Sequence, residues 1–401
     1  MNERVLRELP SLPFITHLEQ VFGNEFRDDF ITQMKPFKDK HFMYSVFNLY
    51  GSTRLKGRLK EGGMHKFAKH EGPLMLDSGG FQFFKKIAYG EPIKKELTVE
   101  ELAEIYMDCN LREGDYCVSL DMPPFYDLPM EKQVEMITQT TANFVKLREI
   151  LPKNVGDKLV PVIHGWNEKT IRLSLEGAVS AKVVAIGGFF PVMLKKGGFA
   201  VKQLAMKFKI IMDLVREMSK DFENVRFHGL GASGQNPFHI CSYAGIEQTD
   251  SSAWRQQAAY ILLAFKELPL GYVGQQIRKS FKHPWKEEHD LALRDCDCPV
   301  CDGLSYNEKL EVLRINDETL DSQGNLLPGG GSLGFQLRCV HNVWHYLKEK
   351  LIAQTLSDKG GQIYYNYLKN RFRNSWRNKI FIETIKASRN QVTLERFFKD
   401  R

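Results

Sequence analysis

The sequence predicts an α/β fold, a (β/α)8 TIM-like barrel that carries an inserted zinc-binding subdomain. Short apolar runs alternate with stretches of helical apolar spacing between about residues 42 and 249, and such alternation indicates a parallel sheet with crossover helices. Most of these runs end in a carboxylate, a histidine or glycines, which is typical of a barrel whose strand ends carry the active site. A cysteine-rich segment beginning at about residue 284 interrupts the alternation and indicates an insertion.

The size of the chain suits this architecture. Its 401 residues, 43% of them hydrophobic, can bury a sizeable core, and a barrel of ~250 residues leaves room for insertions. No Gly-x-Gly-x-x-Gly follows the first strand, which disfavours a dinucleotide-binding fold. We therefore predict an N-terminal segment with the main part of the barrel (1–283), a zinc-binding insertion (284–345) and a C-terminal helical segment (346–401).

Seven strands can be read from short apolar runs that end at polar or glycine positions. They are expected at 42–50, 74–77, 115–120, 158–163, 182–186, 224–230 and 245–249. Helices are expected between them, for example after Thr98, which begins a Thr-x-x-Glu capping-box pattern, and from about 129 to 150. An eighth strand would close the barrel, but residues 1–40 are too mixed in composition to place one.

Composition limits the classes of function. The formal net charge of +7 favours a polyanionic partner only weakly, because many basic enzymes have no nucleic-acid role. No apolar stretch approaches the ~20 residues of a membrane span, and the first residues lack the apolar core of a signal peptide. We expect a cytoplasmic protein with no membrane partner, in which the seven cysteines are reduced thiols or metal ligands.

The sharpest local signal is Cys296-x-Cys298-x-x-Cys301. Three thiolates this close along the chain can reach one ion, and zinc bound by sulfur prefers four ligands in a tetrahedron. From the residues alone, candidates for the fourth ligand are His341, His345 and Cys339. A closed four-ligand site is structural rather than catalytic. The plainer alternative is a group of buried thiols without a metal.

Polar residues at the strand ends predict a pocket. Asp77, Asp121, His164 and Asp250 each follow an apolar run, where loops vary over a rigid sheet. Each has a plainer interpretation: Asp77 and Asp250 could cap the next turn or helix, Asp121 could be a turn residue before two prolines, and His164 could be a satisfied polar residue.

The run Asp77-Ser78-Gly79-Gly80-Phe81-Gln82 resembles a signature of the guanine transglycosylases, the queuine/archaeosine tRNA-ribosyltransferase superfamily. The resemblance spans about residues 40–350 with the pocket motifs in order. It implies base exchange, in which a carboxylate attacks the sugar C1′, guanine leaves, and an incoming base displaces the carboxylate from a covalent intermediate. It assigns Asp250 as the nucleophile and Asp77 as the general acid/base.

The resemblance also assigns substrate and metal contacts. The substrate-binding residues it implies are Ser78, Phe81 as a stacking wall, Asp121 at the purine edge, His164, Gly187 and Gly188. His341, followed by Asn342, matches the histidine that completes the family's cysteine motif, although the stretch after Cys301 is longer than in most members. The resemblance therefore favours His341 as the fourth ligand of a structural Zn²⁺.

Three departures from the tRNA enzymes affect the expected substrate. His164-Gly165 stands where they have Gln-Gly, Gly187–Pro191 lacks their glutamate, and Ser251–Arg255 replaces their Pro-Thr-Arg stretch. In these details the chain is similar to the 7-deazaguanine DNA transglycosylases of the DpdA type, which act in bacterial or phage-infected cells. We therefore expect exchange of guanine in DNA for a base such as 7-cyano-7-deazaguanine, a modification that could protect against restriction.

Other partners and functions remain open at this stage. Nucleic acid could be bound by Arg278, Lys279, Lys282 and Trp285, or these could form an ordinary solvated face. A homodimer or partner modification proteins would also suit a DNA-modifying enzyme. Alternative functions are a tRNA-guanine transglycosylase, a non-catalytic nucleic-acid-binding subunit of the same fold, and an unrelated zinc-bearing barrel that acts on small molecules.

Overall fold

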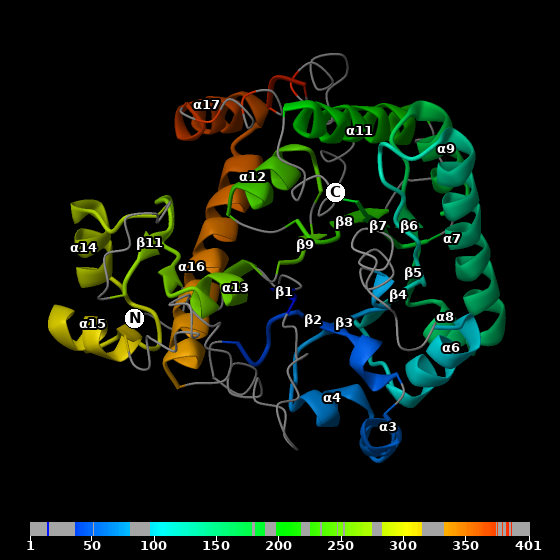
Figure 1. Ribbon diagram of the computed structural model, residues 1–401, viewed down its shortest axis with the longest axis horizontal. Helices are drawn as coiled ribbons and strands as arrows, with labels where there is room; N and C mark the ends of the chain where they lie inside the picture. Colours follow the sequence, from blue (N-terminus) through cyan, green and yellow to red (C-terminus); the bar gives the residue numbers. More distant parts are fainter. Residues whose placement is uncertain are drawn as a thin grey trace, which may run out of the picture.

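The structure is a computed structural model. It describes residues 14–15, 37–50, 52–80, 97–178, 181–188, 198–217, 225–232, 235–246, 248–251, 253–274, 283–314 and 333–373, and positions 375, 379, 382–384 and 386. Within these residues, short parallel strands lie at the centre and helices surround them (Figure 1).

The central strands form two parallel sheets, ordered β1-β2-β3-β4-β5 and β6-β7-β8-β9. Their bounds are β1 Phe14–Ile15, β2 Phe42–Ser45, β3 Leu74–Asp77, β4 Tyr116–Val118, β5 Leu159–Val160, β6 Val162–Ile163, β7 Val183–Ile186, β8 Arg226–Gly229 and β9 Gln248–Thr249. Pro161 separates β5 from β6 because it has no N–H to donate, but its carbonyl still accepts from Ala185 N at 2.9 Å. One interrupted strand, 159–163, therefore joins the two sheets into an eight-strand array.

This arrangement confirms the predicted fold class, and each of the seven predicted strands contains an observed one. The eighth is β1, which pairs in parallel with β2. The strand predicted at 42–50 is too long, since a 3-10 helix, η1 (Val46–Leu49), follows β2. Ser45 and Asp77, the last residues of β2 and β3, pair with each other, so the pairing of these two strands ends there.

Helices connect and cover the strands. The helices before the metal-binding region are α3 Thr53–Lys60, α4 Gly63–Ala68, α6 Val99–Asp108, α7 Met130–Ile150, α8 Lys153–Gly156, α9 Glu168–Glu176, α11 Gly198–Glu217, α12 Gln235–Tyr243 and α13 Ala253–Ala259. The predicted cap of α6 is present, because the Thr98 hydroxyl accepts from Glu101 N at 3.1 Å. Such a cap contributes ~1 kcal/mol.

Apolar side chains fill the barrel interior. Met43, Met75, Val118, Val160, Val162, Val183 and Ala185 form a buried cluster, and larger clusters lie between strands and helices. Full burial of a Val or Met side chain is worth ~1.5–3 kcal/mol. Because the interior is packed rather than open, chemistry is left to the strand ends.

A second group of elements lies outside the barrel. It comprises the antiparallel pair β10 Leu262–Leu263 and β11 Gly271–Tyr272, with α14 Glu287–Arg294 and α15 Tyr306–Arg314. The long helix α16 (Leu333–Asp358) stands between α14 and α15 and the strands, and α17 (Gly361–Arg371) follows it (Figure 1). The division predicted between residues 345 and 346 falls inside α16, so it coincides with no break in secondary structure.

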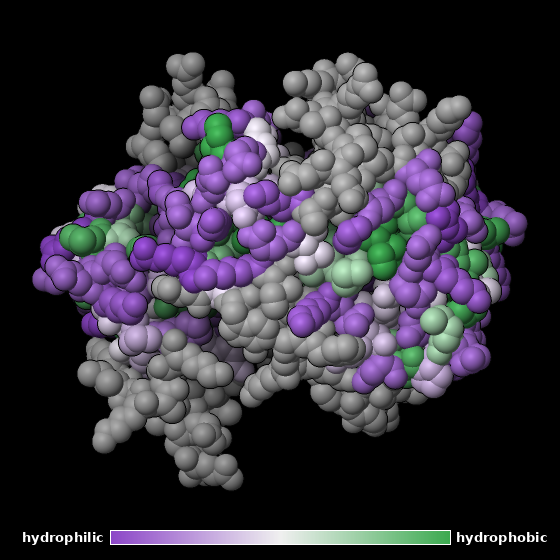
Figure 2. Space-filling model, turned by 90° about the horizontal axis from the view of Figure 1, so that it is seen from above, coloured by the Kyte–Doolittle hydropathy of each residue, from purple (hydrophilic) through white to green (hydrophobic). Residues whose placement is uncertain are grey.

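The surface shown in Figure 2 is mainly hydrophilic, with apolar side chains in separate patches. None of the helices in the described part of the chain is long and apolar enough to cross a membrane.

Candidate active site and metal centre

The predicted pocket residues share one end of the barrel. Asp77 ends β3, His164 directly follows β6, Gly187 directly follows β7, and Asp250 directly follows β9. Because these strands are parallel, the residues lie at the carboxyl ends of the strands, which we call the C-terminal rim. Asp121, beyond β4, also lies there.

Asp250 is a fully buried carboxylate with defined hydrogen bonds. Its Oδ1 lies 2.8 Å from His228 Nε2, and the backbone N–H of Gly231 donates to both carboxylate oxygens at 2.9 Å. Since His228 Nε2 faces a carboxylate, we assign the ring proton to Nε2. Oδ1 accepts from both groups, whereas Oδ2 accepts from Gly231 alone of the two.

His228 was not predicted, although it is the side chain that orients Asp250. It lies in β8, is fully buried, and its Nδ1 has no hydrogen-bond partner among the described residues. The signal in the sequence was a histidine two residues before the end of the strand predicted at 224–230. That position becomes informative only when β8 is placed beside β9.

Asp77 lies half-buried on a tight turn at the end of β3. Its Oδ2 accepts from Gly79 N at 3.2 Å. Gly79 has φ +89°, and a Cβ there would lie 2.8 Å from Cβ of Phe47, so glycine is required. The buried Ser78 hydroxyl next to it has no partner among the residues that the structure describes. Burial and, secondarily, the charge of Asp77 raise the pKa of the Tyr50 hydroxyl well above its usual value.

Asp121 and His164 form a buried pair. His164 Nε2 lies 2.9 Å from Asp121 Oδ2, and within the described part of the chain His164 Nδ1 has no partner. Burial lowers the pKa of His164 although Asp121 opposes this, so the ring is neutral near pH 7, with its proton on Nε2. The plainer interpretation of His164, a polar residue with its hydrogen bonds satisfied, therefore holds for Nε2 and not for Nδ1. The free lone pair on Nδ1 is available to an N–H of a ligand.

Glycines bring the neighbouring loops against this pair. A Cβ on Gly80 would lie 1.8 Å from Asp121 Oδ1, and a Cβ on Gly187 would lie 2.3 Å from His164 Cε1. Gly188 has φ +86°, a conformation that favours glycine. The turn after Asp77, the Asp121–His164 pair and the Gly187–Gly188 turn are thus in contact along the rim.

Some predicted residues lie outside the described part of the chain. Phe81, Arg278, Lys279 and Lys282 are among them, as is the segment 189–191. Trp285 is described. Its indole N–H donates to Asp290 Oδ1 at 2.7 Å, and its ring packs edge-on against Phe265. Its role in stacking nucleic-acid bases stays a prediction.

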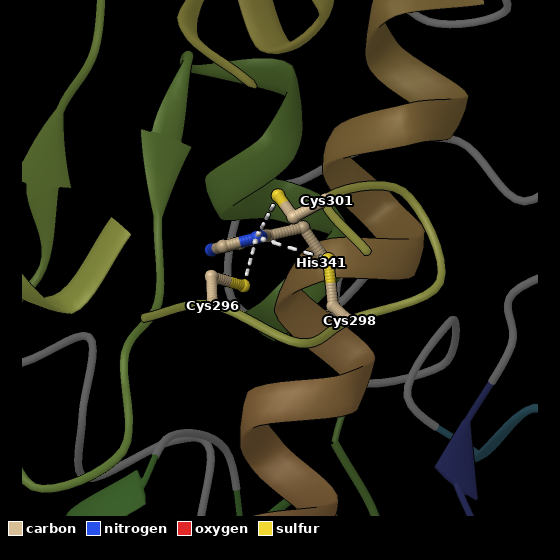
Figure 3. Close-up of side chains that lie close together, drawn as sticks. All are labelled: Cys296, Cys298, Cys301 and His341. Atoms are coloured by element: carbon tan, nitrogen blue, oxygen red, sulfur yellow. Dashed lines mark hydrogen bonds between the residues drawn. The ribbon is translucent and has the colours of Figure 1, made fainter. Parts of the chain in front are cut away.

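The three motif cysteines meet His341 on α16 (Figure 3). The four side chains are buried, and their ligand atoms all lie within 4.8 Å of one another. His341 Nδ1 lies 3.6, 3.5 and 3.8 Å from the sulfur atoms of Cys296, Cys298 and Cys301. With Zn–S near 2.3 Å and Zn–N near 2.0–2.1 Å, a tetrahedral site separates N from S by about 3.6 Å. The residues therefore fit Zn²⁺.

The surrounding hydrogen bonds distinguish His341 from His345. His341 Nε2 faces the Ala264 carbonyl at 3.1 Å, so Nε2 carries the proton and Nδ1 is left to coordinate. His345 Nδ1 accepts from the backbone N–H of Lys266 at 3.2 Å, and its Nε2 lies 3.3 Å from Cys296 Sγ. His345 is thus a donor to the thiolate. Of the three candidates, the structure places only His341 in the cluster.

Two further side chains secure the metal-binding loop and helix α16. The buried Lys309 amine donates to the carbonyls of Leu293, Arg294 and Cys296 at 3.2, 2.7 and 2.9 Å. Asn342 donates to the carbonyls of Trp254 and Leu262 at 3.0 Å and accepts from Ala264 N at 2.8 Å. Asn342, the residue after His341, therefore ties α16 to α13 and β10.

Comparison with known proteins places the chain in a family. The model of the Queuine tRNA-ribosyltransferase family matches residues 32–353. The tRNA-guanine(15) transglycosylase of Methanobrevibacter smithii is 25% identical over 288 residues, which cover 70% of this chain and 38% of that protein. That of Pyrococcus furiosus is 24% identical over 305 residues, 74% of this chain and 45% of that protein.

The similarity extends to further archaeal proteins of the same name. The tRNA-guanine(15) transglycosylase of Thermococcus kodakarensis is 23% identical over 341 residues, 83% of this chain and 49% of that protein. The chain thus spans less than half the length of these relatives. The matched region includes β2 to β9 with the whole C-terminal rim, together with all four residues of the metal cluster. The chain belongs to the queuine tRNA-ribosyltransferase family.

Proposed function

We propose that the protein exchanges a guanine base in nucleic acid for a 7-deazaguanine, through a covalent intermediate on Asp250. The observation that carries the proposal is the buried Asp250 carboxylate, fixed by His228 and Gly231 at the rim of a barrel of this family. A carboxylate held in one orientation is suited to nucleophilic attack at a sugar carbon.

The proposed reaction has two displacement steps. Asp250 Oδ2 attacks C1′ of the target nucleotide, the bond from C1′ to the base nitrogen breaks, and its electron pair leaves with guanine, which takes up a proton. The corresponding nitrogen of the incoming base then attacks C1′, releases Asp250, and loses its proton. Asp77 is assigned the transfer of these protons, as the second carboxylate of retaining sugar chemistry.

Recognition of the base is assigned to Asp121 and His164. Because His164 occupies Oδ2 of Asp121, Oδ1 is the oxygen available to accept from the N–H groups of a purine edge. His164 Nδ1 is a second acceptor. Acceptors of this kind suit the amino and imino groups of guanine and of its 7-deaza analogues.

Both tRNA and DNA are candidates for the nucleic acid. The named relatives act on tRNA, so the comparisons support tRNA better than the DNA expected from the sequence. The departures at His164-Gly165 and Ser251–Arg255 are the observations that keep DNA as the second candidate. Ser251 is buried directly after the nucleophile, and its hydroxyl accepts from Ala253 N at 3.1 Å.

Exchange of labelled guanine, measured in parallel on tRNA, single-stranded DNA and duplex DNA, tests the proposal. We expect label in tRNA and a covalent adduct on denaturing gels. Asp250→Asn should form none, whereas Asp157→Asn, at an exposed carboxylate away from the rim, should behave as wild type. Exchange confined to DNA would reverse the choice of polymer. Absence of exchange on all three would support the non-catalytic subunit.

A further inference from the structure

Lys207, on α11, is a buried lysine that the proposed reaction does not use. Its side chain is almost inaccessible to solvent. Its amine donates to the Gly187 carbonyl at 2.6 Å and lies 4.6 Å from the centre of the Trp166 ring. Among the residues that the structure describes, no carboxylate pairs with this amine. A buried amine without a counter-ion is an expensive group, so a functional role is worth seeking.

The amine of Lys207 lies directly behind the proposed base pocket. A Cβ on Gly188 would lie 2.9 Å from Lys207 Nζ, and a Cβ on Gly187 would lie 2.3 Å from the His164 ring. A single glycine turn therefore separates the amine from the pair formed by His164 and Asp121. The charge of Lys207 is also felt at His164, where it contributes to the lowered pKa.

We propose that Lys207 determines which 7-deazaguanine the pocket accepts. Its positive charge favours a neutral, electron-rich 7-substituent such as a nitrile and opposes a cationic aminomethyl group. This inference rests on the proposed function, because it assumes that the base binds between Asp121, His164 and the Gly187–Gly188 turn. Two like charges a few ångströms apart in a partly buried site should separate the two bases by about tenfold or more.

The charge of Lys207 gives the selectivity a pH dependence. Burial lowers the pKa of Lys207 to about 7, so the amine is charged below that pH and neutral above it. An aminomethyl group, with an ordinary amine pKa near 10, stays charged throughout.

The groups around the amine do not reverse the direction of this pH dependence. His164 is neutral because burial lowers its pKa. Asp121 is hydrogen-bonded to that ring, and Trp166 is uncharged. On α11 itself, Lys209 pairs with Asp213 at 2.6 Å. Selection against the aminomethyl base is therefore strongest below pH 7.

The test is a competition between the 7-cyano and 7-aminomethyl bases, followed by kcat/KM for each at pH 6 and pH 8. In wild type the preference for the cyano base should fall by about five- to tenfold from pH 6 to pH 8, because the charged fraction of Lys207 falls from about nine-tenths to about one-tenth. In Lys207→Met the preference should be smaller and the same at both values. Lys209→Met, two residues along the same helix, should follow wild type.

Two results would overturn the inference. One is a wild-type preference that does not change with pH, a measurement that requires no variant to fold. The other is a Lys207→Met enzyme that keeps the wild-type preference and its pH dependence. Labelled guanine exchange distinguishes a failure of this inference from a failure of the proposed function. Normal exchange with no such preference removes only the role of Lys207. No exchange on tRNA or DNA removes the proposed function and this inference with it.

Discussion

His228 Nε2 and Asp250 Oδ1 lie 2.8 Å apart, from the neighbouring parallel strand ends of β8 and β9. The pair resembles the one at 2.9 Å between Asp121, beyond β4 of the first sheet, and His164, which follows β6 of the second. In both, a buried imidazole holds one carboxylate oxygen, and the second oxygen of Asp250 accepts from Gly231 N. We assign the second oxygen of Asp250 to the sugar and that of Asp121 to the base.

Substitution of the proposed nucleophile Asp250 and substitution of His228, which holds it, should have different effects. Asp250→Asn should remove several orders of magnitude in rate and abolish the covalent adduct. His228→Gln should form the adduct more slowly, because the carboxylate remains but loses its orienting donor. Quantifying adduct on denaturing gels over time checks both. A His228→Gln enzyme with the wild-type rate of adduct formation would show that the histidine is only a packing residue.

Asp77→Asn should reduce turnover strongly while leaving nucleic-acid binding intact. The amide can still occupy the turn held by Gly79, but it cannot take up or release a proton as a carboxylate does. Single-turnover exchange and a separate binding assay distinguish the two effects. Equal loss of binding and of turnover would instead indicate a structural role for Asp77.

The metal cluster predicts one Zn²⁺ per chain. His341→Ala should lower both zinc content and melting temperature, since binding free energy of a structural metal is folding free energy. His345→Gln, a change four residues along the same helix, should keep the metal, because His345 only donates to Cys296. Elemental analysis of purified proteins checks this. Full metal content in a Cys298→Ser/Cys301→Ser double variant would contradict the assigned site.

A buried ion pair outside the rim should dominate acid stability. Glu349 Oε1 on α16 lies 2.8 Å from His239 Nε2 on α12 and is paired with Arg371 on α17. Burial would raise the pKa of Glu349, but His239 and Arg371 outweigh it and lower that pKa. The carboxylate therefore adds stability above its unfolded pKa of ~4.3, and this is lost as pH falls through the folded pKa.

Glu349→Gln should destabilise the fold by about 3–5 kcal/mol near pH 7, because it leaves buried partners uncompensated. Glu288→Gln, in a 3.7 Å pair with Lys286 at the surface, should change stability by at most about 1 kcal/mol. Denaturant unfolding from pH 3 to pH 7 checks both. The difference between wild type and Glu349→Gln should shrink toward acid pH, and a constant difference would refute the linkage.

The sequence allowed the fold class and the rim to be predicted because each strand is a short apolar run with a polar end. It could not reveal β1, since two residues carry no periodicity. His228 and Lys207 were missed for a tertiary reason: their partners are Asp250 and Gly187, which only the strand order brings near. The fourth ligand stayed open from spacing alone because His341 and His345, four residues apart, share one helix face.

The helix α16 carries the candidate metal ligand His341, the residue Asn342 that binds α13 and β10, and the buried acid Glu349 within less than half of its length. We therefore expect a perturbation at any one of these three residues to affect the other two through the helix. We expect the metal loop, α13 and the junction of α12 with α17 to open as one cooperative unit. In hydrogen exchange, a chelator should then deprotect amides of α12 and α13 together with those of α14, whereas amides of α7, on the far side of the barrel (Figure 1), should be affected last.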